Sequence, residues 1–111
     1  MFNPSCIFCK VINHELPSKV IKQDDYALTI QNIAPQAPIH YLIIPRHHYT
    51  DLKELDSCCI GYGILDMARQ LSKSEPGASD FRVLINNGFG AGQRVFHLHM
   101  HFLAGTQLPE F

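Results

Sequence analysis

Residues 92–103 read GQRVFHLHMHFL, with three histidines at alternate positions and apolar residues between them. Side chains alternate between the two faces of a β-strand, so a strand here places His97, His99 and His101 on one face. The apolar residues between them would then face a core. We therefore expect a final strand over residues 95–103 that presents a row of imidazoles.

Such a row has three interpretations. It can be a solvated strand face that happens to be rich in histidine, or a metal site built from three histidines. Same-face neighbours lie about 6.7 Å apart, so two of them can share one ion but all three would struggle to do so. The third interpretation is covalent catalysis, in which one imidazole attacks and its neighbours orient and protonate.

The turn before the histidines favours the third interpretation. It contains Asn86, three glycines up to Gly92, and then Gln93 and Arg94. Glycines allow a backbone to approach an anion closely, and a nest of backbone N–H groups is a phosphate cradle. The alternative is a flexible hairpin, but the position next to the histidines favours anion binding.

Elsewhere the patterns predict an α+β chain with a single domain over residues 1–111. An amphipathic helix is expected from about Leu52 to Leu71, because apolar residues recur there every three to four positions. Hairpin-like connections predict a mainly antiparallel five-stranded sheet with one long and one short helix. The short helix is expected over residues 6–13 and the strands over residues 19–23, 26–31, 40–44, 81–86 and 95–103.

Composition narrows the function classes. Of the 111 residues 46% are hydrophobic and 17% charged, and the formal net charge is −1, so neither nucleic acid nor a membrane surface is an expected partner. No apolar run reaches the roughly 20 residues of a membrane helix, and the N-terminus does not resemble a secretory signal. The four cysteines are therefore expected to be reduced thiols in the cytoplasm, with at least one of Cys58 and Cys59 buried.

The sequence resembles the histidine triad (HIT) family. The segment His97-Leu98-His99-Met100-His101-Phe102-Leu103 matches the family's alternation of histidine with hydrophobic residues. The resemblance extends through Ile7 to Lys10, Asn32 to His40, Ile44 to His48 and Asn86 to Gln93. Order and spacing are similar to the Hint-like branch of nucleoside phosphoramidases, and the resemblance implies a HIT-like fold.

The resemblance also implies roles. His99 would attack the α-phosphorus of a nucleoside monophosphate linked to an amine, forming a nucleotidyl-histidine that water then hydrolyses. His101 would contact the phosphate and leaving group, while His97 and His40 would orient the site. No cofactor is expected for catalysis. The residues implied to bind the purine nucleotide are Ile7, Phe8, Val11, Ile30, Asn32, Ile33, Asn86, Gly92, Gln93 and Arg94.

Cys6-x-x-Cys9 has metal-ligand spacing, and two thiols need two more ligands for tetrahedral zinc. Similarity to bacterial members of the family indicates His48 and His97, although His47 adjoins the first of them. Such a zinc would be structural. The alternatives are two reduced, partly buried cysteines or a thioredoxin-type redox pair, which the flanking sequence does not favour.

The expected activity is hydrolysis of a purine nucleoside phosphoramidate such as adenosine 5′-monophosphoramidate, by a homodimer paired through the long helix and the strand after it. A nucleotide-binding adaptor with incidental slow hydrolysis is the alternative, and a metal-dependent enzyme is a third possibility. Asn32 stands where the family usually has an aspartate that meets the ribose, and Arg94 where it often has a small hydroxyl residue. The C-terminal segment, Thr106 to Phe111, lacks the tryptophan seen in some relatives.

Overall fold

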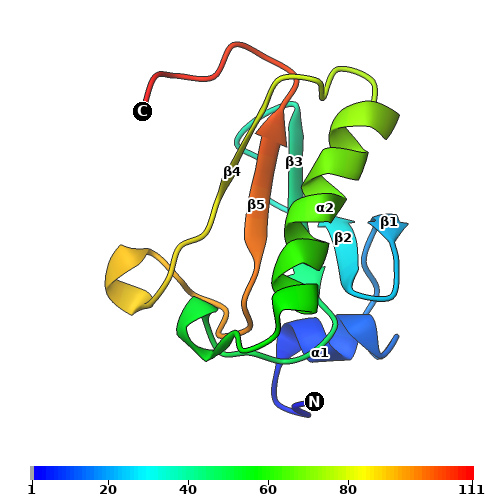
Figure 1. Cartoon of the computed structure of the whole chain (residues 1–111), viewed down its shortest axis with the longest axis vertical. Coiled ribbons are helices and arrows are strands. Elements are labelled where there is room, and N and C mark those ends of the chain that lie inside the picture. The colour runs from blue at the N-terminus through cyan, green and yellow to red at the C-terminus, as the bar shows by residue number, and fades with distance from the viewer. Residues whose placement is uncertain (1) are drawn as a thin grey trace.

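The computed structural model describes residues 2–111, and in it one sheet lies between two helices (Figure 1). Two short 3₁₀ turns, η1 and η2, interrupt the connections. Along the chain the elements are α1 (Ile7–Ile12), β1 (Val20–Gln23), β2 (Ala27–Gln31), β3 (Ile39–Pro45), η1 (Leu52–Glu54), α2 (Cys58–Ser74), β4 (Phe81–Leu84), η2 (Phe89–Ala91) and β5 (Met100–Ala104).

The sheet has five strands in the order β1-β2-β3-β5-β4, and every neighbouring pair is antiparallel. The acidic turn between β1 and β2 makes the expected hairpin. The α+β class and the antiparallel five-stranded sheet predicted from the sequence are therefore confirmed. The last strand does not join the sheet edge but inserts between β3 and β4, which places it near the middle.

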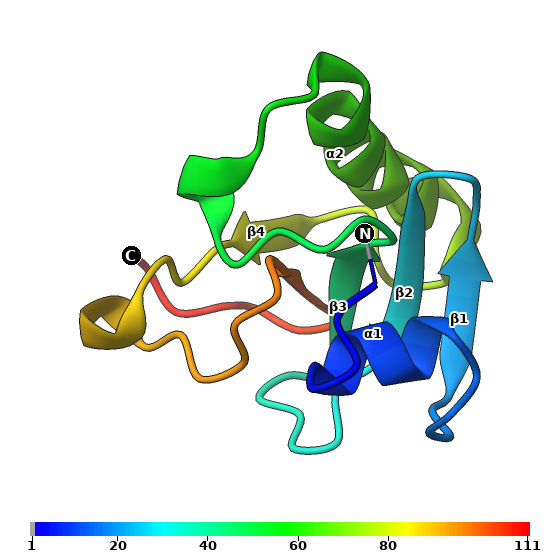
Figure 2. The same ribbon diagram turned by 90° about the horizontal axis from the view of Figure 1, so that it is seen from below.

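The two helices cover opposite faces of the sheet (Figure 2). Because side chains alternate along a strand, β3 contributes to both cores. Tyr41 and Ile43 belong to the core under α2, whereas Leu42 and Ile44 belong to the core under α1. On β5 Phe102 lies in the α2 core, so the residues on either side of it face the α1 side. His101 and its neighbour on β3, His40, are on this second face.

Helix α2 begins where the Ser57 hydroxyl accepts the Ile60 N–H at 3.2 Å, a side-chain cap that satisfies one of the free donors of the first turn. Its buried residues recur every three to four positions, as an amphipathic helix requires. At Gly63 the helix touches the β-hairpin so closely that an added Cβ would lie 2.6 Å from the Tyr26 Cβ. None of the helices within residues 2–111 is long and apolar enough to cross a membrane.

Three expectations need correction. The final strand begins at Met100 rather than at residue 95, because its partner strand ends at Pro45, which has no N–H to continue the ladder. The long helix begins at Cys58, since the Leu52 region forms the separate 3₁₀ turn capped by Asp51. Strand β4 ends at Leu84, two residues before the expected limit.

The expectation of a buried residue in the Cys58–Cys59 pair was also wrong. Both thiols are exposed, on the first turn of α2. The two other cysteines are buried, Cys6 at the N-cap of α1 and Cys9 within that helix. The free thiols of this chain therefore fall into two classes with different surroundings.

Candidate active site and metal-ligand cluster

The three histidines of the row lie next to one another although only His101 belongs to a regular strand. The ring centroids of His99 and His101 are 5.3 Å apart. The edge of Phe8 on α1 meets His97 at 5.9 Å and His99 at 5.2 Å between centroids. A bend covers residues 95–97, and the contacts with Phe8 place the rings of His97 and His99 on the α1 side of the sheet.

His99 has one ring nitrogen held and one open. Its Nδ1 lies 2.8 Å from the main-chain oxygen of His97, and a carbonyl can only accept, so Nδ1 carries the proton. The lone pair is then on Nε2, which has no hydrogen-bond partner within residues 2–111 and is not sealed from solvent. Burial lowers the pKa of His99, and the bond to His97 opposes that shift in part. His99 is therefore a neutral imidazole with an available nucleophilic nitrogen.

His101 is held by His40, the histidine of β3. The register places Leu42 opposite His101, so His40 is its diagonal neighbour on the same face. Nε2 of His40 lies 2.9 Å from Nδ1 of His101. Burial lowers the pKa of His101 to about 4 and also lowers that of His40. The two rings are therefore neutral near pH 7.

The second cluster joins α1 to the start of the histidine row. One ligand atom from each of Cys6, Cys9, His48 and His97 lies within 4.8 Å of the other three. Nδ1 of His97 is 3.4 Å and 3.6 Å from the two sulfurs and 3.1 Å from Nδ1 of His48. Tetrahedral zinc with two sulfurs and two nitrogens needs ligand separations of about 3.3–3.8 Å. The four donors are therefore of the types that bind zinc and lie close together, in a cluster that spans up to 4.8 Å and would have to contract slightly around the ion.

Two further contacts support that fit. The second ring nitrogen of His97 lies 2.9 Å from the carbonyl of Pro45, which fixes the proton on Nε2 and leaves the Nδ1 lone pair for the cluster. His48 rather than the exposed His47 is the member of the pair that reaches Cys9, at 3.3 Å. Burial raises the pKa of Cys9, which a bound cation would counteract. Across residues 2–111, three or more potential ligand atoms come together only in this cluster.

Gln93 and Asn86, both expected to bind phosphate, lie in the same turn but make different hydrogen bonds. Gln93 is buried, and its Oε1 accepts the Gly88 N–H at 2.7 Å. Its Nε2 donates to the carbonyls of Thr50 at 2.8 Å and Val95 at 3.1 Å, so this amide braces the turn. The Asn86 amide makes no hydrogen bond within the described chain and lies beside Gly92, where an added Cβ would be 3.7 Å from it.

Arg94 folds back onto the turn. Its guanidinium stacks on Phe89 with 4.0 Å to the ring centroid and donates to the Phe89 carbonyl at 2.8 Å. Both glycines that bound the turn, Gly88 and Gly92, have φ near +100°, a region that side chains avoid. The turn therefore has a defined backbone conformation, with the Arg94 side chain packed on it.

An apolar cavity of about 290 Å³ opens between α1 and the end of β2. All six residues expected to hold the base and ribose line it: Ile7, Phe8, Val11, Ile30, Asn32 and Ile33. Sequence reasoning missed three further lining residues, Gln31, Leu42 and Val95. Leu42 could have been found, since it lies two residues after His40 and therefore on the same face of its strand.

The chain is similar to known proteins along most of its length. The family model of the HIT domain matches residues 13–108. A histidine triad protein from Clostridium difficile is 37% identical, with a TM-score of 0.94 over 100% of this chain and 99% of that one. A HIT family hydrolase from Clostridium thermocellum is 37% identical, with a TM-score of 0.92 over 98% and 97%. A zinc-bound histidine triad family protein from Mycobacterium smegmatis is 30% identical, with a TM-score of 0.80 over 90% and 74%.

Proposed function

The chain belongs to the histidine triad family, and from this premise we propose that it hydrolyses purine nucleoside phosphoramidates, such as adenosine 5′-monophosphoramidate, through a nucleotidyl group on His99. One observation carries the proposal. The open Nε2 of His99 belongs to a ring that packs against Phe8, and Phe8 also lines the apolar cavity. A planar base in that cavity would bring its phosphate to the histidines.

The cavity suits a nucleoside. Its walls are aliphatic and aromatic, with the amide of Asn32 at the rim, which is the usual composition of a site for a flat apolar group with a polar attachment. Ile33 is fully exposed without a ligand, so covering a base would bury one side of it. The loop from Asn32 to Pro38 then forms the outer wall, and α1 forms the inner one.

The reaction has two steps. Nε2 of His99 uses its lone pair to form a bond to the α-phosphorus while the bond to the leaving nitrogen breaks, and that nitrogen keeps the electron pair and takes up a proton. Water then attacks the phosphorus and restores His99, so that overall the elements of one water are divided between the nucleoside monophosphate and the amine. Imidazole suits both steps because it is a nucleophile and a leaving group near neutral pH.

Charge that develops on the phosphoryl oxygens needs donors already in place. The Asn86 amide and the backbone N–H groups around Arg94 would supply them, while Gln93 keeps the turn in shape. His101 would donate a hydrogen bond to the phosphate and the leaving group, and His40 and His97 would position the rings.

We further assign a structural zinc to Cys6, Cys9, His48 and His97, whose donor atoms and separations fit it. Zinc bound there would neutralise the two thiolates and tie α1 to the segment before β5. The base cavity lies partly on α1, so the ion would also stiffen one wall of the nucleotide site. No chemical step requires it.

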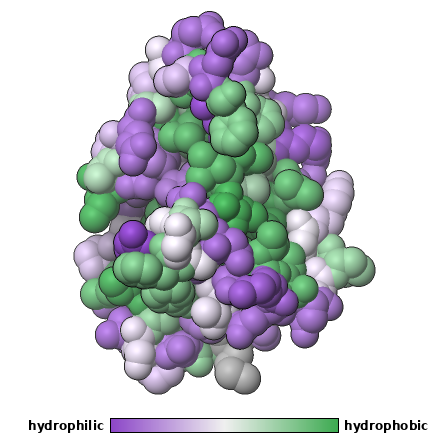
Figure 3. All heavy atoms as spheres, turned by 90° about the vertical axis from the view of Figure 1, so that its left-hand side faces the viewer, coloured by the Kyte–Doolittle hydropathy of each residue, from purple (hydrophilic) through white to green (hydrophobic). Residues whose placement is uncertain are grey.

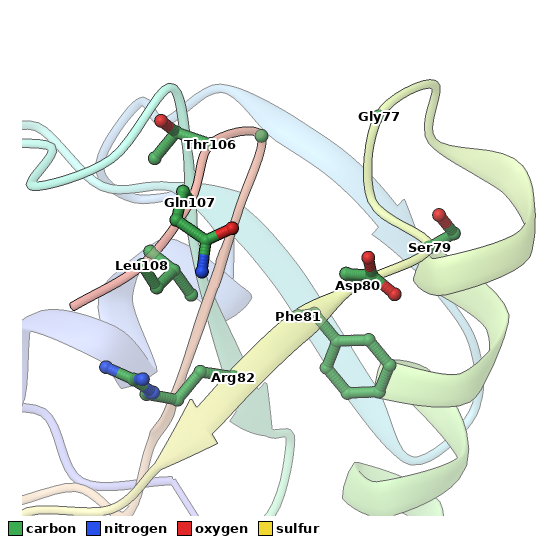
Figure 4. Close-up of a pocket in the computed structure, with 9 residues that line it drawn as sticks. Gly77, Ser79, Asp80, Phe81, Arg82, Thr106, Gln107 and Leu108 are labelled. Atoms are coloured by element: carbon green, nitrogen blue, oxygen red, sulfur yellow. The ribbon is translucent and has the colours of Figure 1, made fainter. Parts of the chain in front are cut away.

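The proposal includes a homodimer. Cys58, Tyr62 and Leu65 form an exposed stripe along α2 at helical spacing, apart from its buried face. Phe81 is exposed at the start of β4, an edge strand of the sheet. Seen from the β4 side, the surface carries a band of hydrophobic side chains (Figure 3). A cleft of about 480 Å³ separates this strand from residues 105–108 (Figure 4).

The activity is tested by mixing the protein with a fluorogenic adenosine phosphoramidate and quenching with acid-free denaturant within one turnover. Mass spectrometry should find one adenylyl group per chain, on the peptide that contains His99. Turnover without any adduct, in wild type and in His101→Asn alike, would argue against the covalent route. Tight nucleotide binding without turnover would instead support an adaptor.

The dimer is tested by light scattering at micromolar concentration. Leu65→Asp should convert a dimer into a monomer, because it places a charge in the buried centre of the interface. Leu16→Asp, at an exposed leucine outside the stripe, is the matched control and should remain dimeric. A monomeric wild-type chain would exclude the homodimer.

A further inference from the structure

The two buried thiols of the chain are one helical turn apart at the start of α1. Cys6 is the N-cap residue of that helix, and its sulfur accepts the Cys9 N–H at 3.4 Å. Both thiols are free. Helix geometry places Cα atoms three residues apart at a distance of about 5 Å, within the range of about 4.4–6.8 Å that a disulfide requires. The main-chain spacing of the pair therefore suits a disulfide, which rotation of the two side chains would close.

The same two cysteines enclose part of the base cavity. The residues between them in the sequence are Ile7 and Phe8, and both line the apolar cavity. Phe8 also packs against the ring of His99. A disulfide between Cys6 and Cys9 would therefore close a small ring of chain around the two residues that form one wall of the nucleotide site.

The pair is buried but not sealed. A cleft of about 280 Å³ is lined by Cys6 and His48 of the cluster, and by Ser5 and Phe96 among its other walls. The exposed fraction is 9% for Cys6 and 1% for Cys9, so Cys6 is the thiol that a molecule in the cleft meets first. A water molecule occupies about 30 Å³, so the cleft admits an oxidant little larger than water.

Zinc in the cluster would make the pair ready for oxidation. Metal ligation requires both thiols to be deprotonated, and the thiolate is the form that oxidants attack. The two remaining ligands, His48 and His97, cannot complete a tetrahedral site alone. Conversion of both sulfurs to a disulfide would therefore remove half of the ligands in one event.

We propose that Cys6 and Cys9 form an oxidation site for hydrogen peroxide, at which disulfide formation expels zinc and weakens nucleotide binding. The inference rests on the structural zinc and the nucleotide cavity of the proposed function. The Cys6 thiolate attacks one peroxide oxygen and becomes a sulfenic acid as hydroxide leaves. The Cys9 thiolate then attacks that sulfur, the S–S bond forms and a second hydroxide leaves. Two thiolates thus lose two electrons, the peroxide gains them, and two protons complete two waters.

The experiment uses the zinc-loaded Cys58→Ser, Cys59→Ser double variant, in which Cys6 and Cys9 are the only thiols. One equivalent of hydrogen peroxide should release one zinc per chain, measured with a colorimetric chelator. Thiol titration should show the loss of both thiols, and mass spectrometry the loss of two hydrogens with no added oxygen. A dithiol reductant followed by zinc should restore the starting form.

The role of the cleft is tested by filling it. Ser5→Trp places a large side chain at a wall of the cleft and should slow zinc release by peroxide at least about fivefold. Ser18→Trp is the matched control, because it changes an exposed serine that lies outside the cleft. Its rate of zinc release should equal that of the parent.

The effect on the nucleotide site is tested without turnover. Calorimetric titration with adenosine monophosphate should give an affinity at least about fivefold weaker in the oxidised form, the lower end of typical coupling between sites. Hydrogen exchange of the α1 amides should be faster in that form. Zinc removal by a chelator with both thiols reduced separates the effect of metal loss from that of the disulfide.

Different results would overturn different parts of the inference. Zinc that stays bound, or that leaves with oxygen added to one sulfur, would exclude the disulfide route. Equal rates for Ser5→Trp and Ser18→Trp would exclude the cleft as the way in. An oxidised chain with unchanged α1 exchange and unchanged nucleotide affinity would exclude the coupling. A purified chain without zinc would refute the metal site itself, whereas a chain that binds nucleotide but turns over no phosphoramidate would refute only the proposed activity.

Discussion

The two ends of the histidine row contain the same side chain in opposite situations. At one end His97 is fully buried, with one ring nitrogen held by the Pro45 carbonyl and the other facing two sulfurs and His48. At the other end His101 is half-buried, with one nitrogen held by His40 and the other open. Burial lowers the pKa of both to about 4. Burial makes both rings neutral. The two rings differ because both nitrogens of His97 have partners, whereas one nitrogen of His101 makes no hydrogen bond within the described chain.

His99 lies between these two cases and resembles the second. Its Nδ1 bonds to a main-chain carbonyl, which orients the ring, and its Nε2 makes no hydrogen bond within residues 2–111. Under the proposed function, the row would change along its length from a structural end, at His97, to a reactive end, at His99 and His101. Substitutions at the two ends should have different consequences, and each prediction below tests that division.

The largest effect is expected at the reactive end. His99→Ala should lower kcat by at least about a thousandfold, or about 4 kcal/mol, because the covalent route is lost. Nucleotide affinity should stay within about tenfold, since few ground-state contacts disappear. Steady-state kinetics and calorimetric titration with a nucleoside monophosphate measure the two quantities. A variant that keeps more than a tenth of the activity would assign the nucleophile to another residue.

At the structural end, changing Cys6 and Cys9 together to serine should abolish zinc binding and lower stability. Structural zinc supplies much of the folding free energy of small domains, so a loss of several kcal/mol and a fall of more than about 10 °C in Tm are expected. Activity of the folded fraction should change far less. The matched control is the double serine variant of the exposed pair Cys58 and Cys59. Zinc by elemental analysis that is equal in both variants would refute the site.

The side-chain amides of Gln93 and Asn86, both in the turn before the histidines, should also differ, the first in its effect on stability and the second in its effect on activity. Gln93→Ala removes three internal hydrogen bonds from a buried group and should cost about 2 kcal/mol in the free energy of unfolding. Asn86→Ala should leave stability within about 0.5 kcal/mol but lower kcat/KM by up to about tenfold, because its donors are free for substrate. Denaturant unfolding and kinetics on both variants decide the matter. Equal losses of stability would mean that Asn86 has a structural role.

The smallest effect concerns pH. His101 has a folded-state pKa of about 4 and an ordinary unfolded value of about 6.5. Between these values the unfolded chain binds more protons, so stability falls as pH decreases from about 6.5 to about 4. The slope due to His101 is at most about 1.4 kcal/mol per pH unit and smaller after solvent screening. His101→Asn should flatten the dependence in that window, and an unchanged slope would place the proton uptake elsewhere.

Much of the fold followed from local patterns. The β-prone runs on either side of the turn at Asp24 and Asp25 predicted the first hairpin, and the apolar run of residues 40–44 predicted β3, because residue preference and turn chemistry are local properties. The start of β5 did not follow, since it depends on Pro45 being opposite residue 98 in the register, a long-range relation. The exposure of Cys58 and Cys59 also depends on how α2 is rotated against the sheet, which composition does not reveal.

In the candidate site, too, local patterns could be predicted from the sequence and contacts set by the fold could not. The four cluster residues came from spacing and family resemblance, and the structure brings them together. The Gln93 amide makes three internal hydrogen bonds, whereas the Asn86 amide makes none within the described chain. The sequence could not predict this difference, because both residues are amides that flank the same glycine turn. The contact of Asn32 with His40 depends on the Asx turn closed by Ala34, a local detail with no distinct signal in composition.

His97 contributes its ring to the cluster and its main-chain carbonyl to His99. These two contributions place different demands on the residue at position 97. Every residue type has a carbonyl, so the contact with His99 does not require histidine, whereas the contacts with the two cysteines and with Pro45 use the ring. A lineage that lost Cys6 and Cys9 would therefore free position 97 to vary, subject to the Pro45 contact, without touching the nucleophile. Co-variation of position 97 with the cysteines, rather than with His99, would be the record of that history.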